Sequence, residues 1–182
     1  MDIKTFFIAS AAFPEMEEYV LSVAAAGTNV FLTGTCAHDA NTLIDKISEK
    51  GASAYYYNAA GSDYFSCTAD AVVACAEKFG GIDLLIFGES HSSKTELFLD
   101  MSEKDFACYT GMLQSFFWLC KCALPYMLGR EKPAVVMPVE EDHEPRNIAR
   151  AMYRAACLAM LKNMADEFKS YGIEVRPALI PM

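Results

Sequence analysis

A row of three arginines is the most suggestive chemical pattern in the chain. Arg146, Arg150 and Arg154 repeat every four residues, so on a helix they share one face. Guanidinium groups in such a row could bind an anionic ligand, such as a phosphate of coenzyme A. They could also pair with nearby carboxylates, and ion pairing is the interpretation that we favour. The acids concerned are Glu140, Glu141 and Glu144.

Two other groups could hold a metal, and both are weak candidates. The acidic run over residues 140–144 lacks a His pair or an ordered turn, so we expect a solvated loop and no metal. Cys120 and Cys122 lie on different sides of a helix, and no second pair completes a zinc set. The chain has seven cysteines, an odd number at irregular spacing. We therefore expect reduced thiols and a cytoplasmic location.

The elements that must position these residues alternate between strand and helix. The strand-like runs are nearly continuously apolar, as in strands that are covered on both faces. This alternation predicts an α/β fold, a Rossmann-like doubly wound parallel sheet with helices on both faces and six strands. We expect strands at 5–9, 29–33, 52–57, 83–87, 133–139 and 173–180, and helices at 14–26, 38–50, 64–79, 103–127 and 146–171.

Composition limits the class of protein. The chain has 182 residues, of which 53% are hydrophobic, and this length suits a single domain over residues 1–182. Its formal net charge of -9 disfavours nucleic acid as a partner, because the phosphate backbone would be repelled. No apolar run reaches the roughly 20 residues that a membrane-spanning helix needs. We expect a protein without a membrane or nucleic-acid partner.

Four segments carry a resemblance to a known family. They are GGIDLLIF (80–87), CALPYM (122–127), PAVVMPV (133–139) and ADEFKSYGIEVRPALIP (165–181). In this order and spacing they resemble the short-chain dehydrogenase/reductase family, which writes three of them as FGxIDxLVNNAG, AxLPxM and LAxExxxYGIRVNxVxPG. The resemblance covers nearly the whole chain. Because the family usually continues into a substrate lid, it also implies a degenerate member that is truncated after the sixth strand.

The resemblance implies that the cofactor site has been lost. The family's glycine-rich turn, TGxxxGxG, falls on ASAAFPEM, and its three glycines become Ser10, Pro14 and Met16. Those glycines let the backbone approach a pyrophosphate at the helix N-terminus. Pro14 removes an N–H, Met16 fills space, and Glu15, Glu17 and Glu18 add negative charge. We therefore expect this chain to bind no NAD.

The catalytic positions of the family are also replaced. Its Asn, Ser, Tyr and Lys positions fall on Met112, Met137 (or Pro138), Arg150 and Arg154. Arginine stays protonated at all relevant pH and cannot replace the tyrosine in proton transfer. Tyr153 is a candidate for a shifted tyrosine, but Cys157, not lysine, lies four residues after it. We therefore predict no catalytic residues in this chain.

Two long helices, near 103–128 and 146–170, are the predicted partner surface. In this family the corresponding helices commonly pair with a partner's copies in a four-helix bundle. Their apolar load exceeds what packing on a sheet requires, although an ordinary core stripe remains the other interpretation. The predicted interface residues are Phe106, Phe116, Phe117, Trp118, Tyr126, Met152, Tyr153, Leu158 and Leu161.

These features together predict a pseudo-enzyme that serves as a structural subunit. A heteromeric branch of the family pairs an inactive short subunit with an active, NAD-dependent subunit that oxidises a hydroxyacyl-CoA. The resemblance implies such a partner here, with NAD bound by the partner alone. Two alternatives stay open: an enzyme of altered chemistry that uses Tyr153 and the arginines, and a stand-alone homodimeric binding or regulatory module.

Overall fold

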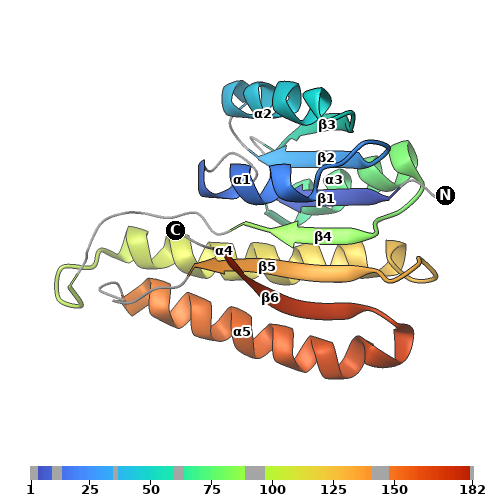
Figure 1. The fold of residues 1–182 in the computed structure, drawn as a ribbon. Helices are drawn as coiled ribbons and strands as arrows, with labels where there is room; N and C mark the ends of the chain where they lie inside the picture. The colour runs from blue at the N-terminus through green and yellow to red at the C-terminus, as the bar shows by residue number, and fades with distance from the viewer. Residues whose placement is uncertain are drawn as a thin grey trace.

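A computed structural model describes residues 4–9, 14–34, 37–59, 64–88, 97–140 and 148–180, and contains one six-stranded parallel sheet (Figure 1). The strand order is β3-β2-β1-β4-β5-β6, and every pairing is parallel. This order is that of a doubly wound Rossmann-like sheet, so the predicted fold class is confirmed. The strands are β1 (Thr5–Ala9), β2 (Asn29–Gly34), β3 (Ser53–Asn58), β4 (Leu84–Phe87), β5 (Ala134–Glu140) and β6 (Glu174–Ile180).

The helices follow the predicted alternation, with small differences at their ends. They are α1 (Pro14–Val23), α2 (Ala37–Glu49), α3 (Tyr64–Phe79), α4 (Glu103–Ala123), α5 (Ile148–Phe168) and two 3-10 turns, η1 (Leu124–Tyr126) and η2 (Lys169–Tyr171). α1 ends earlier than predicted because the Thr28 hydroxyl accepts from the Ala25 N–H and donates to the Ala25 carbonyl. α4 starts after Ser102, whose Oγ accepts a hydrogen bond from the Asp105 N–H.

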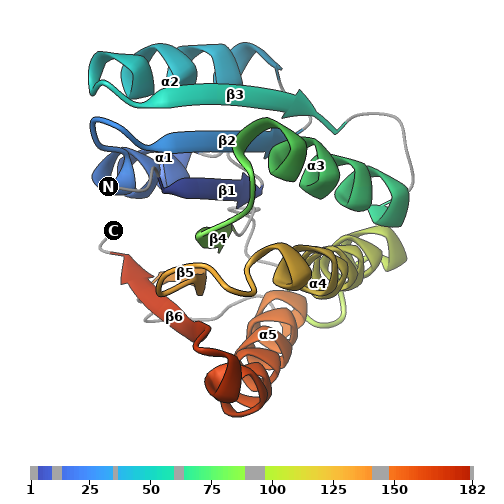
Figure 2. The ribbon, with the colours of Figure 1, turned by 90° about the vertical axis from the view of Figure 1, so that its right-hand side faces the viewer.

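The two faces of the sheet are covered unequally. Figure 2 shows α3, α4 and α5 along one side of the sheet and α1 on the other. The core under α3, α4 and α5 reaches from Phe31 on β2 to Val175 on β6. The core under α1 and α2 draws its strand residues from β1 to β4 only, and Ile86 on β4 is its outermost fully buried member. The helix pair α4 and α5 therefore packs on the larger of the two cores.

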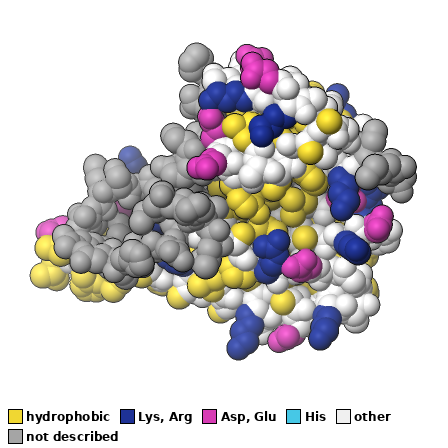
Figure 3. Space-filling model, viewed as in Figure 1, with side chains coloured by type: hydrophobic (Ala, Val, Ile, Leu, Met, Phe, Trp, Pro, Cys, Tyr) yellow, Lys and Arg dark blue, Asp and Glu magenta, His cyan; other side chains and the backbone are white. Residues whose placement is uncertain are grey.

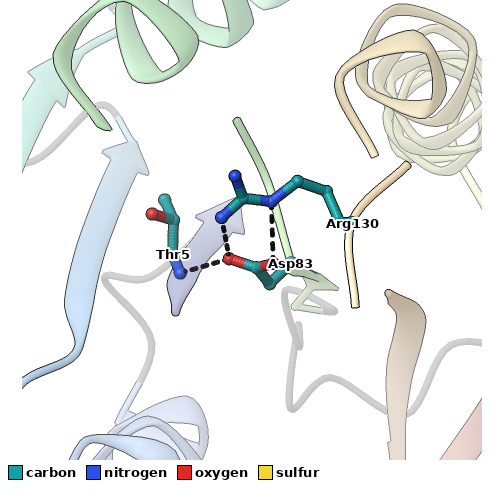
Figure 4. A network of polar contacts seen from close by, with 3 residues as sticks. All are labelled: Thr5, Asp83 and Arg130. Atoms are coloured by element: carbon teal, nitrogen blue, oxygen red, sulfur yellow. Dashed lines mark hydrogen bonds and ion pairs between the residues drawn. The ribbon is translucent and has the colours of Figure 1, made fainter. Parts of the chain in front are cut away.

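A buried ion pair ties the amino edge of the sheet together (Figure 4). Asp83, which precedes β4, is 6% exposed and accepts from the Thr5 backbone N–H at 2.7 Å. Arg130, in the turn before β5, donates to the same carboxylate through Nε (2.8 Å) and Nη2 (2.7 Å). A buried carboxylate is tolerated when it is paired and fully hydrogen-bonded in this way. The contacts join the starts of three neighbouring strands.

Gly81 allows this arrangement to form. Its φ of +144° favours glycine, and an added Cβ would lie 3.1 Å from the Tyr126 carbonyl oxygen and 3.3 Å from Cδ of Arg130. The neighbouring Ile82 N–H donates to that same carbonyl at 3.1 Å. The turn η1, which follows α4, is thereby held against the start of β4. Among the described residues, no helix is long and apolar enough to cross a membrane.

Candidate functional site

In this fold a ligand site is expected at the carboxyl edge of the sheet, beside β1. β1 pairs with β2 on one side and β4 on the other, so the chain reverses its direction of winding there. Ligands of doubly wound sheets bind in the crevice at this reversal. The first turn of α5 follows the carboxyl end of β5 and lies at the same edge (Figure 1). Ser10 lies outside the residues that the structure describes.

The first turn of α1 contributes a side chain to the core of the protein. The helix begins at Pro14, which has no N–H to offer a phosphate. Met16, two residues later, is 2% exposed and belongs to the core with Ile8, Val20 and Leu32. A side chain buried in this way contributes to folding, and removing it would leave a cavity. Met16 is therefore a core residue, and its correspondence to a glycine of the family stays a prediction.

The negative charge predicted beside this turn is partly compensated. Glu17 pairs with Lys46 on α2, with 2.5 Å between Oε1 and Nζ, and both side chains are partly exposed. Glu18 is exposed. The charge at the start of α1 is therefore smaller than the count of three glutamates indicates.

The positions predicted for the family's Asn and Ser are occupied by thioethers. Met137 on β5 is completely buried, and Met112 on α4 is half-buried against the same core. A thioether has no proton to donate and is only a weak acceptor. Neither residue can orient a carbonyl or support a proton relay, and both pack as ordinary core side chains.

Arg150 and Arg154 lie one turn apart near the start of α5. Both side chains are half-buried, and both take part in interactions with other residues of the protein. A guanidinium holds its protons at all relevant pH, so the pair supplies positive charge and hydrogen-bond donors without acid–base chemistry. The ion pairing that we favour, and the alternative of anion binding, both stay predictions, because Arg146, Glu141 and Glu144 lie outside the described residues.

Tyr153 is part of the core between α4 and α5. The residue is 1% exposed, its ring centroid lies 6.2 Å from that of Tyr109 on α4, and its hydroxyl oxygen is inaccessible to solvent. A tyrosine in this position cannot reach a substrate at the sheet edge without a rearrangement of the helix pair. This geometry counts against the alternative that uses Tyr153 in altered catalysis.

The predicted interface residues divide into an exposed and a buried set. Phe106 and Phe117 are 44% and 46% exposed, Tyr126 and Met152 are also exposed, and Trp118 and Leu158 are half-buried. The prediction is wrong for Phe116, Tyr153 and Leu161, which lie in the chain's own core. Phe116, for example, packs on Phe87 of β4 with ring centroids 5.0 Å apart. The helices bury one apolar side and expose another.

The sequence reasoning missed one exposed apolar segment. Leu97, Phe98 and Leu99 precede α4, and Leu99 is 92% exposed. Ile148, in the first turn of α5, is exposed as well. The available signal was three consecutive large apolar residues followed by Asp100, a run too short for a buried strand and outside any helical period. Exposed apolar side chains thus occur around the N-terminal ends of α4 and α5, and Figure 3 shows further hydrophobic side chains in the middle of the face viewed in Figure 1.

The buried thiols are poor nucleophiles. Burial raises the pKa of Cys75 from 9.0 to about 12, and burial together with the neighbouring Cys157 raises the pKa of Cys120 further. Both thiols stay protonated at neutral pH, and only a thiolate is an effective nucleophile or metal ligand. Within the described ranges, no three His, Cys, Asp or Glu side chains are grouped so as to hold a metal ion.

The fold is a doubly wound, Rossmann-like sheet, and the comparisons agree on its family. A family model described as "short chain dehydrogenase" matches residues 17–181. The chain belongs to this family. The match begins one residue after Met16, so the segment on which the family's glycine-rich turn falls lies outside it.

Individual relatives are consistent with this assignment. The chain is 29% identical to "Oxidoreductase UcpA" of Salmonella typhimurium over 177 residues, which cover 94% of this chain and 66% of that protein. A short chain dehydrogenase from Mycobacterium thermoresistibile superposes with a TM-score of 0.84 at 22% identity, covering 97% of this chain and 66% of that one. The NADH-dependent reductase A1-R′ complexed with NAD gives a TM-score of 0.85 at 18% identity, covering 100% of this chain and 79% of that one. The chain spans just under two thirds of the length of the curated relatives that it matches.

Proposed function

We propose that this chain is a non-catalytic subunit of a heteromeric NAD-dependent short-chain dehydrogenase complex. The observation that carries the proposal is Met16, which is buried in the core at the helix N-terminus where the family places a glycine. A dinucleotide pyrophosphate would need backbone N–H groups and open space there. Pro14 supplies no N–H, and Met16 puts a large core side chain where that glycine would allow close packing of helix and strand. On this proposal the chain binds no NAD.

The residues at the family's catalytic positions support the same proposal. Arg150 and Arg154 stand where the family has the tyrosine and lysine of its acid–base pair, and neither arginine can give up a proton. Met137, at the serine position, is fully buried. This chain keeps the sheet and both long helices. On this proposal it has lost the catalytic activity of the family and kept its fold.

The proposed partner is an active short-chain dehydrogenase subunit that binds NAD. It would dock on α4 and α5, near residues 103–128 and 146–170, where Phe106, Phe117 and Met152 are exposed. Apolar side chains of this size are costly to leave in water, and burying them would stabilise both folds by mass action. In the partner we propose oxidation of a hydroxyacyl-CoA, such as 2-[hydroxy(phenyl)methyl]succinyl-CoA in the benzylsuccinate pathway of anaerobic toluene degradation.

Co-expression with an intact short-chain dehydrogenase encoded beside this chain tests the proposal. We expect a stable mixed oligomer by light scattering after size exclusion, with NADH bound by the partner only. Stoichiometric binding of NADH by this chain alone would refute the non-catalytic assignment. Loss of the mixed oligomer in Phe106→Ser/Met152→Ser, but not in the control Val73→Ser on α3, would locate the docking face, because Val73 is exposed to a similar extent.

One observation favours the homodimeric module as the second candidate. Phe106 and Phe117 on α4 are exposed, and a second copy of this chain would cover them in a homodimer. A chain that forms a homodimer and no mixed oligomer with any neighbouring dehydrogenase would support that candidate over the heteromeric one.

A further inference from the structure

β6 is the last strand of the sheet and, among the residues that the structure describes, pairs with β5 only (Figure 2). An edge strand of seven residues presents a row of backbone N–H and C=O groups along its outer side. Such a row is a template on which a strand of another chain can add. The outer edge of β6 is therefore a surface through which a sheet of this kind can extend into a partner or aggregate.

The bonds between β5 and β6 show which backbone groups of β6 face outward. The Glu174 N–H donates to the Pro133 carbonyl oxygen at 2.9 Å, so the backbone of Glu174 faces β5. Successive residues of a strand direct their N–H and C=O groups alternately to the two sides of the strand. The even-numbered residues of β6 therefore all bond to β5. The outer edge consists of the backbone groups of the odd-numbered residues, which are Val175, Pro177 and Leu179.

Pro177 occupies the middle one of these three outward positions. Its nitrogen carries no hydrogen, and the pyrrolidine ring lies where an N–H would point to a neighbouring strand. The residue is in register with Met137 on β5, but its backbone faces away from that strand, so the proline costs the sheet no internal hydrogen bond. Proline is tolerated within a sheet at such outward positions of an edge strand. Pro177 therefore interrupts the outer edge alone.

The interruption leaves little for an incoming strand to pair with. Val175 and Leu179 are the two outward residues that keep an N–H, and they are about 13 Å apart along the strand. A ladder that used both residues would have to cross Pro177, where one hydrogen bond is missing and the exposed ring crowds the approaching backbone. A ladder that avoided Pro177 would be limited to one outward residue.

We propose that Pro177 closes the outer edge of β6 to strand addition, by a second copy of this chain and by other proteins alike. Partners of this chain then dock through side-chain surfaces, and the sheet does not continue across a subunit boundary at β6. This inference goes beyond the proposed function and does not rest on it, because the edge is closed in a monomer, a homodimer and a mixed oligomer.

Replacement of Pro177 in the full-length chain tests the proposal. Pro177→Thr restores an outward N–H in a residue type that favours strands. We expect this variant to self-associate about tenfold or more above the wild type in sedimentation velocity, because the paired edge gains a hydrogen bond from each copy. Glu174→Thr is the matched control on the same strand. Glu174 is exposed and its N–H already bonds to β5, so this control should associate as the wild type does.

Hydrogen exchange gives a second measurement that needs no variant. In the wild type, the outward amide of Val175 should exchange much faster than the amide of Arg176, which faces β5. In associated Pro177→Thr, the Val175 amide should become protected, since a strand of the second copy would pair with it. This measurement decides the proposal even if Pro177→Thr fails to fold.

Three results would overturn the proposal. One is a wild type in which the Val175 amide is protected as well as that of Arg176, because the edge would then already be paired. Another is a Pro177→Thr variant that unfolds thermally like the wild type and associates no more than it does. The third is equal association of Glu174→Thr and Pro177→Thr, which would assign the effect to the introduced side chain instead of the restored N–H.

Discussion

Removal of the Arg130 guanidinium should destabilise the protein far more than removal of a surface cation. Arg130→Met keeps most of the aliphatic chain beside Gly81 and deletes both hydrogen bonds to Asp83. The Asp83 carboxylate would remain buried with the Thr5 N–H as its remaining donor in the network. The cost therefore comes from a buried charge without its counter-ion, more than from the lost attraction.

The magnitude follows from the exposure of the two partners. Breaking a buried ion pair from one side costs about 3–5 kcal/mol, and the 27% exposure of the Arg130 side chain places this case at the lower end, about 3 kcal/mol. At roughly 2–4 °C per kcal/mol for a domain of this size, the melting temperature should fall by roughly 6–12 °C. Lys46→Met, which breaks the half-exposed pair with Glu17, should cost only about 0–1 kcal/mol.

Urea and thermal denaturation followed by circular dichroism measure these differences. Asp83→Asn combined with Arg130→Met should recover part of the loss, because the double variant leaves no unpaired charge, and the recovery is the coupling between the two residues. If Arg130→Met lowered the free energy of unfolding no more than Lys46→Met, the Asp83–Arg130 pair would not stabilise the fold as a buried ion pair. A double variant that cost the sum of Asp83→Asn and Arg130→Met would show that the two side chains are not coupled.

Three further predictions concern the core and the thiols. Phe116→Ala should cost about 3–5 kcal/mol and Phe117→Ala under about 1 kcal/mol in the monomer, because only Phe116 is buried; equal losses in denaturant titrations would contradict this. Burial raises the pKa of Cys75 to about 12, so the thiol ionises first in the unfolded chain, and the free energy of unfolding should fall as pH rises above 9.0. Cys75→Ala should make this fall of the unfolding free energy with pH shallower by about 1.4 kcal/mol per pH unit. An unchanged dependence on pH would refute the raised pKa of Cys75. A thiol reagent should label exposed Cys108 rapidly and Cys75 only on unfolding, and labelling of both at one rate would contradict the burial.

The order of the fold could be predicted because its signals are local. Continuous apolar runs give the strands, and glycines such as Gly51 and Gly172, both with positive φ, mark the ends of the helical segments. The bonds between Thr28 and Ala25 that shorten α1 depend on side-chain geometry, so the helix end could not be predicted to within a residue.

The candidate site could be predicted only in part. The resemblance alone assigns Met16 to a glycine position of the family, but the burial of Met16 depends on Ile8, Val20 and Leu32, which only the fold brings together. On α4, large apolar residues occur on both sides of the helix, so periodicity could not separate buried Phe116 from exposed Phe117.

The hydrogen bonds among Asp83, Arg130 and Thr5 affect how such a chain can change over evolutionary time. They fasten the starts of three strands, at the opposite edge from the crevice in which doubly wound sheets bind their ligands. Selection on foldability and selection on chemistry therefore act on different ends of the same strands. On the proposed function, residues such as Pro14, Met16 and Arg150 changed at one end while the other end still guided the chain to the same sheet. A protein that loses catalytic activity in this way keeps a stable fold, and that fold can acquire another function.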